Sequence, residues 1–222
     1  MAPNYQAGRD AVSGFKRDYT GKIIDEVYTQ VNQPDYSAEI AQLQAAKPDA
    51  VYVFYPGGMG VNFVKQYRQS GLLGKIPLIS VSTIDGSTLP ALKDLAIGAV
   101  TSAPYSPDLD NAQNKQFVAA FEKKYHRSPS MYAAQSYDAA NLIDSALART
   151  HGSVTDRAAL RTALKAADFH SVRGSFKFAS NQFPEAPFYR VDVIKGPDGA
   201  AFATKSEIHI KKRADFAAQC KM

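Results

Sequence analysis

The stretch SAEIAQLQAAKPDAVYVFYPGGMGVNFVKQYRQSG, residues 37–71, decides the fold class of this chain. It predicts a helix that ends at Pro48, because proline cannot continue the helical hydrogen-bond ladder. The next residues, 50–55, are apolar without alternation, which is typical of a parallel strand covered on both faces. A glycine-rich turn at residues 56–60 then leads into a second helix, which Gly71 is placed to terminate.

A strand that enters a helix through glycines presents unpaired N–H groups at the carboxyl edge of a sheet. Ligands of open α/β folds bind at that edge. Asp35 or Ser37 is expected to cap the first helix, and Asp110 a later one. Further strands are expected at residues 76–81, 98–103, 175–178, 188–195 and 206–210, and further helices at 89–95, at 131–149 and from Ser153 onward. The order predicts an alternating α/β fold with a short β-rich end.

The composition is that of an ordinary globular protein, with 222 residues, 45% hydrophobic and 21% charged. No run of eighteen apolar residues exists, so no membrane-spanning helix is expected. The chain shows no signal peptide, so an export signal is expected to have been removed or never present. The net charge of +5 is interleaved with acids except at residues 211–213, which read as a solvated face and do not predict nucleic-acid binding. Cys220 is either a terminal thiol or the partner of a segment absent from this chain.

The motifs of common catalytic and metal sites are missing. The four histidines have no cysteine or carboxylate at ligand spacing, so no metal site is expected. The run at residues 57–60, GGMG, fits neither a P-loop nor a dinucleotide-binding fingerprint, so no cofactor is expected. Asp138, after Tyr137, could suggest acid–base work, but a buried aspartate satisfied by backbone or tyrosine is favoured. The chain is not expected to be an enzyme.

Several segments resemble a known family when they are taken together in order. They are residues 4–10 (NYQAGRD) with Phe15 and Lys16, 35–37 (DYS), 47–51 (KPDAV), the turn at Gly57 and Gly58, 132–139 (YAAQSYDA), 172–178 (VRGSFKF) and 219–222 (QCKM). The chain resembles the type I periplasmic substrate-binding proteins of ABC transporters, in the leucine/isoleucine/valine-binding group. The last two segments are similar to its aromatic-acid branch.

This resemblance implies a three-layer, parallel-sheet lobe with an incomplete second lobe, the two closing on ligand by a hinge. Residues 1–104 and 187–222 would form the C-terminal lobe, and residues 105–186 a remnant of the N-terminal lobe. The strands that open that lobe would precede Met1, as in an N-terminally truncated member. The resemblance also implies a periplasmic location and a membrane permease as partner. A ligand-sensing regulatory module of the same fold is the alternative, and an enzyme with unrecognised catalytic groups is a third.

The family's ligand contacts carry over to the ends of three strands and to two further segments. The implied ligand-binding residues are Tyr5, Gln6, Ala7, Tyr55, Pro56, Gly57, Gly58, Ser82, Thr83, Tyr105, Tyr132 and Gln135. For Tyr55 and Tyr132, packing in the core is an equally weighted alternative. For Gly57 and Gly58, the alternative is a tight turn, which is compatible with close approach to a ligand carboxylate.

The expected ligand is a small carboxylate. Amino-acid binders of the family hold the α-ammonium with an acidic side chain where this chain has Ser82, although the nearby Asp85 leaves another register open. A buried ammonium without a carboxylate partner is costly. The sequence therefore favours an aromatic acid, stacked on tyrosines, over leucine or another branched-chain amino acid. Self-association is also expected, because the helix at 131–149 lacks the sheet that its Leu142–Leu147 stripe would cover.

Overall fold

A computed structural model of the chain describes residues 1–208 and 220. These residues form two compact units. Unit 1 comprises Met1–Ala103 and Arg190–Lys205, and unit 2 comprises Pro104–Tyr189 and the described residues from Ser206 onward. The lobe boundaries implied by the family resemblance stay a prediction. The units differ from them at residue 104, at residues 187–189 and from 206 onward.

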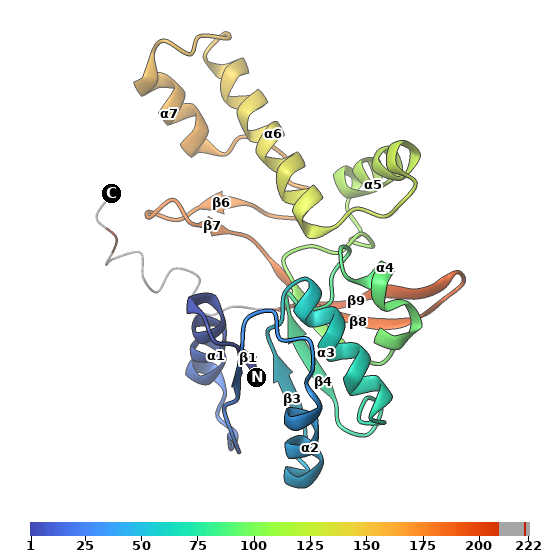
Figure 1. Cartoon of the computed structure of the whole chain (residues 1–222). Coiled ribbons are helices and arrows are strands. Elements are labelled where there is room, and N and C mark those ends of the chain that lie inside the picture. Colours follow the sequence, from blue (N-terminus) through green and yellow to red (C-terminus); the bar gives the residue numbers. More distant parts are fainter. Residues whose placement is uncertain (209–219, 221–222) are drawn as a thin grey trace. The chain divides into compact units, whose positions relative to one another are not determined.

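Unit 1 is built on a mostly parallel sheet with the order β3-β4-β5-β8-β9 (Figure 1). Its strands are β3 (Val51–Val53), β4 (Leu78–Val81), β5 (Val100–Ala103), β8 (Phe188–Gly196) and β9 (Gly199–Ile208). The first three are parallel, with Val53 opposite Ser80 and Ser80 opposite Thr101. A two-stranded parallel sheet, β1 (Ala2–Pro3) with β2 (Tyr28–Thr29), lies beside them. The Phe54 N–H donates to the Met1 carbonyl at 3.1 Å, which places β1 next to β3.

Helices cover both faces of β3, as its unbroken apolar sequence predicts. Val51 and Val53 face the main core, which α2 (Ser37–Ala46) and α3 (Gly58–Gln69) complete with Tyr36, Ile40, Phe63, Val64 and Tyr67. Tyr52 points to the other face, where its ring stacks on Phe15 of α1 (Gln6–Asp18), with centroids 4.5 Å apart. A short helix α4 (Leu89–Leu92) and a 3-10 turn (Lys93–Ala96) lead to β5. The predicted α/β class with a parallel sheet is confirmed.

Unit 2 contains α5 (Ala112–Tyr125), α6 (Met131–Arg149), α7 (Arg157–Ala166) and a hairpin of β6 (Lys177–Phe178) with β7 (Pro184–Glu185). The rings of Phe117 on α5 and Tyr137 on α6 meet at 4.6 Å. Asp138, also on α6, is buried and ion-paired with Arg173 at 2.8 Å. The Asp138 carboxylate also accepts bonds from the Ser171 hydroxyl and the Val172 N–H. The expectation of a buried, satisfied aspartate is confirmed, with a backbone group among its partners.

Two helix starts correct the sequence-based expectations. Asn111, not Asp110, caps α5, because its side-chain oxygen accepts the Asn114 N–H at 2.8 Å. Asp110 instead pairs with Lys115. The N-cap residue of α2, Tyr36, makes no side-chain cap bond, but Asp35, the residue before it, accepts the N–H and the hydroxyl of Ser37, the first residue of the helix. Those two bonds lower the pKa of the Asp35 carboxyl.

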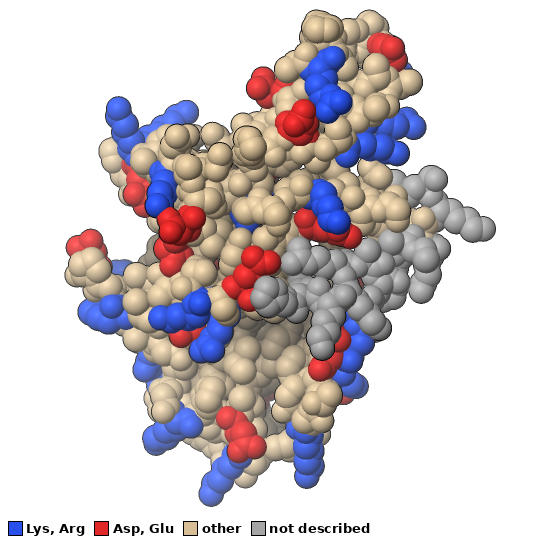
Figure 2. All heavy atoms as spheres, turned by 180° about the vertical axis from the view of Figure 1, so that it is seen from behind, with Lys and Arg blue, Asp and Glu red and all other residues tan. Residues whose placement is uncertain are grey.

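Several other predicted features are shorter than expected or cannot be compared. The strand at 76–81 begins only at Leu78, and the strand at 175–178 is reduced to β6. The basic residues 211–213 and the last two positions of the strand at 206–210 lie outside the described residues. Figure 2 shows Lys and Arg interspersed with Asp and Glu over the visible face, consistent with interleaved charge.

Candidate ligand-binding edge

Two helices begin side by side at the carboxyl edge of the unit 1 sheet. α1 follows β1, with Tyr5 as N-cap, and α3 follows β3, with Gly57 as N-cap. Neither N-cap makes a side-chain hydrogen bond to its helix, and neither first turn contains an acid. The first N–H groups of a helix have no partner within it and carry partial positive charge. The edge therefore offers two sets of donors to an anion.

A glycine in the same helical position holds each helix against the strand before it. Gly8 is the third residue of α1, and a Cβ there would lie 2.0 Å from the Pro3 carbonyl oxygen. Gly60 is the third residue of α3, and a Cβ there would lie 2.2 Å from the Tyr55 carbonyl oxygen. Sequence reasoning assigned no contact to either. Each glycine follows the residue whose carbonyl it faces by five positions, and this shared spacing was the available signal.

Gly57 and Gly58 form an open, exposed turn between β3 and α3. Gly57 has φ +63°, a conformation that side-chain-bearing residues rarely adopt. A Cβ built at either glycine would meet nothing within 4 Å. The turn thus leaves room for another molecule to approach the first N–H groups of α3.

In the loop after β4, Thr83 and Asp85 make hydrogen bonds within the protein, whereas the Ser82 hydroxyl makes none with the described residues. Thr83 is fully buried, and its Oγ1 accepts the Tyr55 N–H at 2.8 Å, tying the ends of β3 and β4 together. Asp85 is 6% exposed, and its carboxylate accepts the N–H groups of Ser87 and Thr88. Ser82 has φ 51°, and its hydroxyl has no hydrogen-bond partner among the described residues. Of the predicted hydroxyl contacts, only Ser82 is therefore available, and Thr83 has a structural role.

Of the two predicted aromatic residues of unit 1, Tyr5 is half-buried and Tyr55 is fully buried in the core. Tyr5 is half-buried at the start of α1, with its ring 6.5 Å from that of Phe54. Tyr55 is fully buried between Tyr36 and Phe63, and its hydroxyl bonds to that of Thr29. Burial raises the pKa of the Tyr55 hydroxyl. For Tyr55 the core-packing alternative holds, so its ring is not placed to stack on a ligand.

The remaining predicted residues belong to unit 2. Tyr105 is 4% exposed and packs edge-on against Phe117, and its buried hydroxyl has no hydrogen-bond partner within residues 1–208 and 220. Tyr132 and Gln135 lie exposed on the first turns of α6. Tyr132 is 50% exposed, so it is not a core residue. The structure gathers the unit 1 residues at one edge, and a role for these three in the same site stays a prediction.

Residues 1–199, most of the chain, match the sequence pattern of the periplasmic binding protein family. The chain belongs to this family. A Leu/Ile/Val-binding protein homolog of Brucella melitensis is 26% identical over 211 residues, covering 91% of this chain and 54% of the homolog. The chain thus spans about half the length of the curated relatives it matches.

Solved structures of longer solute-binding proteins of ABC transporters share the fold. One from Rhodopseudomonas palustris BisB5, in complex with 3,4-dihydroxybenzoic acid, is 30% identical with a TM-score of 0.86. The match covers 96% of this chain and 61% of that one. Another from R. palustris, in complex with benzoate, is also 30% identical, with a TM-score of 0.83 over 95% of this chain and 59% of that one. These are solute-binding proteins rather than enzymes.

The described residues contain neither a candidate membrane-spanning helix nor a cluster of metal ligands. None of the helices in that part of the chain is both long and apolar enough to cross a membrane. Within the same residues, no three His, Cys, Asp or Glu side chains come together as they would around a metal ion.

Proposed function

We propose that this chain is the ligand-binding part of a periplasmic solute-binding component of an ABC importer, which delivers its ligand to a membrane permease. The proposed ligand is a small aromatic carboxylate. The observation that carries this proposal is the pair of uncapped, acid-free helix N-termini of α1 and α3 at one sheet edge. The solute-binding proteins of similar fold from R. palustris, solved with benzoate and 3,4-dihydroxybenzoic acid, support it.

In this proposal the ligand carboxylate accepts hydrogen bonds from the first N–H groups of α3 at the open Gly57-Gly58 turn. The N–H groups around Ala7 at the start of α1 and the Ser82 hydroxyl add further donors. Such charge-assisted bonds are stronger than neutral ones. Tyr5, half-buried at the same edge, would lie beside the ligand ring.

The preference against an amino-acid ligand rests on the acids near this edge. An α-ammonium group needs a carboxylate partner once it leaves water. Asp85 is the acid nearest to Ser82 in the sequence, and its carboxylate is occupied by the Ser87 and Thr88 N–H groups of its own turn. A ligand without an amine needs no such partner. This argument favours an aromatic acid over leucine.

NMR titration of the isotope-labelled chain with 4-hydroxybenzoate and with L-leucine tests the proposal directly. We expect 4-hydroxybenzoate to shift the amide resonances of residues 6–8 and 57–60. Leucine binding at these amides without any response to 4-hydroxybenzoate would overturn the choice of ligand. Calorimetry on a two-lobed version, with the family's preceding segment joined to this chain, would then compare the affinities for the two ligands.

A pair of variants at position 58 isolates the helix N–H group. Proline is tolerated in the first turn of a helix and lacks an N–H, so Gly58→Pro removes one donor while α3 still forms. Gly58→Ala keeps the N–H, and its Cβ enters open space. We expect weaker 4-hydroxybenzoate binding for Gly58→Pro and unchanged binding for Gly58→Ala. Equal affinities in both variants would argue against a carboxylate at this turn.

A further inference from the structure

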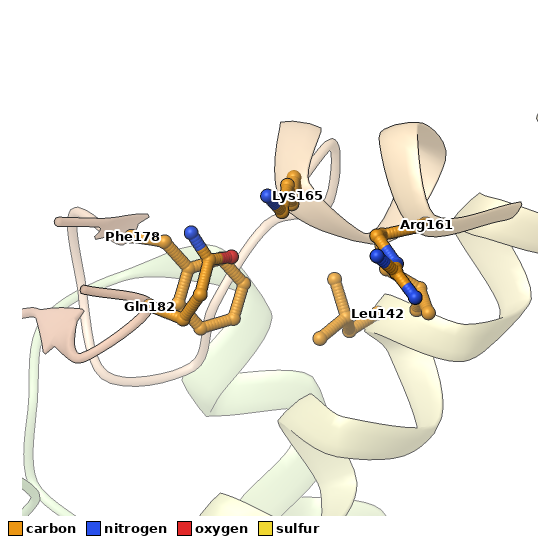
Figure 3. A pocket seen from close by; sticks show the side chains of 6 residues that line it. Leu142, Arg161, Lys165, Phe178 and Gln182 are labelled. Atoms are coloured by element: carbon orange, nitrogen blue, oxygen red, sulfur yellow. The ribbon is translucent and has the colours of Figure 1, made fainter. Parts of the chain in front are cut away.

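Unit 2 contains a pocket between α6, α7 and the β6–β7 hairpin, with Leu142 in its lining (Figure 3). Leu142 belongs to the stripe of α6 that a sheet is expected to cover, so the openness of this pocket does not indicate a ligand site. The ligand-binding edge of unit 1 holds a more informative group, the buried side chain of Thr83.

Thr83, the second residue after β4, joins the ends of two strands through its hydroxyl. The side chain is fully buried. Its Oγ1 accepts the Tyr55 N–H at 2.8 Å and donates to the Val81 carbonyl at 3.2 Å. A hydroxyl has one proton to donate and lone pairs that accept, so the two bonds are compatible. The Thr83 hydroxyl therefore fixes the end of β3 to the end of β4.

Thr83 also lies against the first turn of α3. A Cβ built at Gly60 would lie 2.9 Å from the Thr83 Cγ2 and 2.9 Å from the Thr83 carbonyl oxygen. The helix backbone at Gly60 thus packs directly on Thr83, with no room for a side chain between them. Gly57 and Gly58 open the same helix only two and three residues earlier. A displacement of Thr83 would therefore move the turn at these two glycines.

Further bonds hold the loop that carries Ser82. The Thr88 Oγ1 donates to the Thr83 carbonyl at 3.1 Å and accepts the Asp85 N–H at 2.9 Å. Ser82 itself has φ 51°, a conformation that persists only where the surrounding structure enforces it. Its two neighbours in the chain, Val81 and Thr83, are the residues joined by the Thr83 hydroxyl. The same hydroxyl therefore holds both the α3 turn and the backbone at Ser82.

We propose that Thr83 is a positioning residue of the ligand-binding edge. Its hydroxyl holds the N–H groups of the Gly57-Gly58 turn at the spacing from the Ser82 hydroxyl that a carboxylate needs. The single Thr83 hydroxyl proton is donated to Val81, so none is left for a carboxylate, which only accepts. Hydrogen bonds weaken steeply as their geometry departs from the ideal, so a small shift of either donor set lowers the affinity. This inference rests on the function proposed above for the identity of the ligand, but not for the position of the turn.

NMR of the isotope-labelled chain tests the proposal with Thr83→Val, which keeps the shape of the side chain but leaves the Tyr55 N–H without its acceptor. We expect the fold to persist in circular dichroism, the Tyr55 amide to exchange faster with solvent, and the amide resonances of residues 57–60 and 82 to shift. Thr83→Ser restores the hydroxyl and should return the Tyr55 exchange rate toward that of the wild type. Thr101→Val is the matched control. Thr101 is 2% exposed on β5, its hydroxyl has no hydrogen-bond partner among the described residues, and its replacement should leave the resonances of residues 57–60 in place.

The same titration with 4-hydroxybenzoate gives the effect on binding. Thr83→Val should bind it about threefold or more weakly, whereas Thr83→Ser and Thr101→Val should bind as the wild type does. A residue that only stabilised the fold would lower the urea midpoint and leave the affinity of the folded chain unchanged. Affinity equal to that of the wild type in Thr83→Val therefore overturns the proposal. Unshifted resonances at residues 57–60 in Thr83→Val, or no recovery in Thr83→Ser, overturn it equally.

Two further outcomes are kept apart by measurements on the free chain. If the wild type does not bind 4-hydroxybenzoate, the ligand proposed above is wrong, and the amide resonances of the free variants still decide whether Thr83 positions the turn. If Thr83→Val does not fold, hydrogen exchange of the wild type decides. Exchange at the Tyr55 amide as fast as at the exposed Gly57 and Gly58 overturns the proposal, and much slower exchange supports it.

Discussion

Replacing Arg173 with methionine should strongly destabilise unit 2. The Arg173 Nε lies 2.8 Å from the Asp138 carboxylate, and the two side chains are only 9% and 2% exposed. Removing the cation leaves a buried carboxylate with the Ser171 hydroxyl and the Val172 N–H as its remaining partners. Breaking a buried ion pair in this way costs about 3–5 kcal/mol. That is a large part of the roughly 5–15 kcal/mol that stabilises a typical domain.

The position of Arg173 adds two further reasons for a large effect. Its guanidinium lies over the Phe176 ring, 5.3 Å from the centroid, so a cation–π contact is lost as well. Its carbonyl accepts the Tyr189 hydroxyl at 2.7 Å, and Tyr189 is the last residue of unit 2 before the chain returns to unit 1. The loss of stability in Arg173→Met should therefore extend from α6 to the start of β8.

Urea unfolding followed by far-UV circular dichroism measures the effect, since the chain has no tryptophan to report by fluorescence. Arg149→Met is the matched control, because the Arg149–Asp168 pair is 51% and 69% exposed and such pairs contribute about 0–1 kcal/mol. The double variant Asp138→Asn/Arg173→Met should lose less stability than the sum of the single variants. If Arg173→Met costs no more than Arg149→Met, the reasoning about the buried pair is refuted.

Three other predictions concern packing, pH and association. Gly60→Ala should destabilise unit 1 by about 1–3 kcal/mol in urea unfolding, because its Cβ would lie 2.2 Å from the Tyr55 carbonyl oxygen; a cost no larger than that of Gly58→Ala would contradict this contact. Burial raises the pKa of Tyr36 and Tyr52 to about 12, whereas unfolded tyrosine ionises near 10, so the stability present below about pH 10 should fall as the pH rises toward 12. Constant urea midpoints across that window would count against it. Ile143 of α6 is 53% exposed, and we expect light scattering to show that the chain self-associates and that the Ile143→Lys variant does so less. A monomeric wild type would show that this apolar face does not drive association.

The order of strands and helices in unit 1 was predictable because its signals are local. The unbroken apolar run before the Gly57-Gly58 turn indicated a strand covered on both faces, and the structure places α1 on one face and α2 and α3 on the other. Positive φ at Gly57 is likewise a property of the turn itself. The first residue of a helix was harder to predict. Asp110 and Asn111 are both good N-cap residues, and only the observed backbone selects Asn111.

The state of each side chain at the ligand-binding edge was decided only by the tertiary structure. Tyr55 and Thr83 are 28 residues apart, and their hydrogen bond gives the Thr83 hydroxyl a partner within the protein. The partners of Asp138 come from 33 to 35 residues along the chain, so its role could be expected but its ion pair could not. Sequence determines which residues lie near the end of a strand because chain direction and periodicity are local properties. Whether such a residue faces the core or a ligand depends on groups that only folding brings within hydrogen-bond distance.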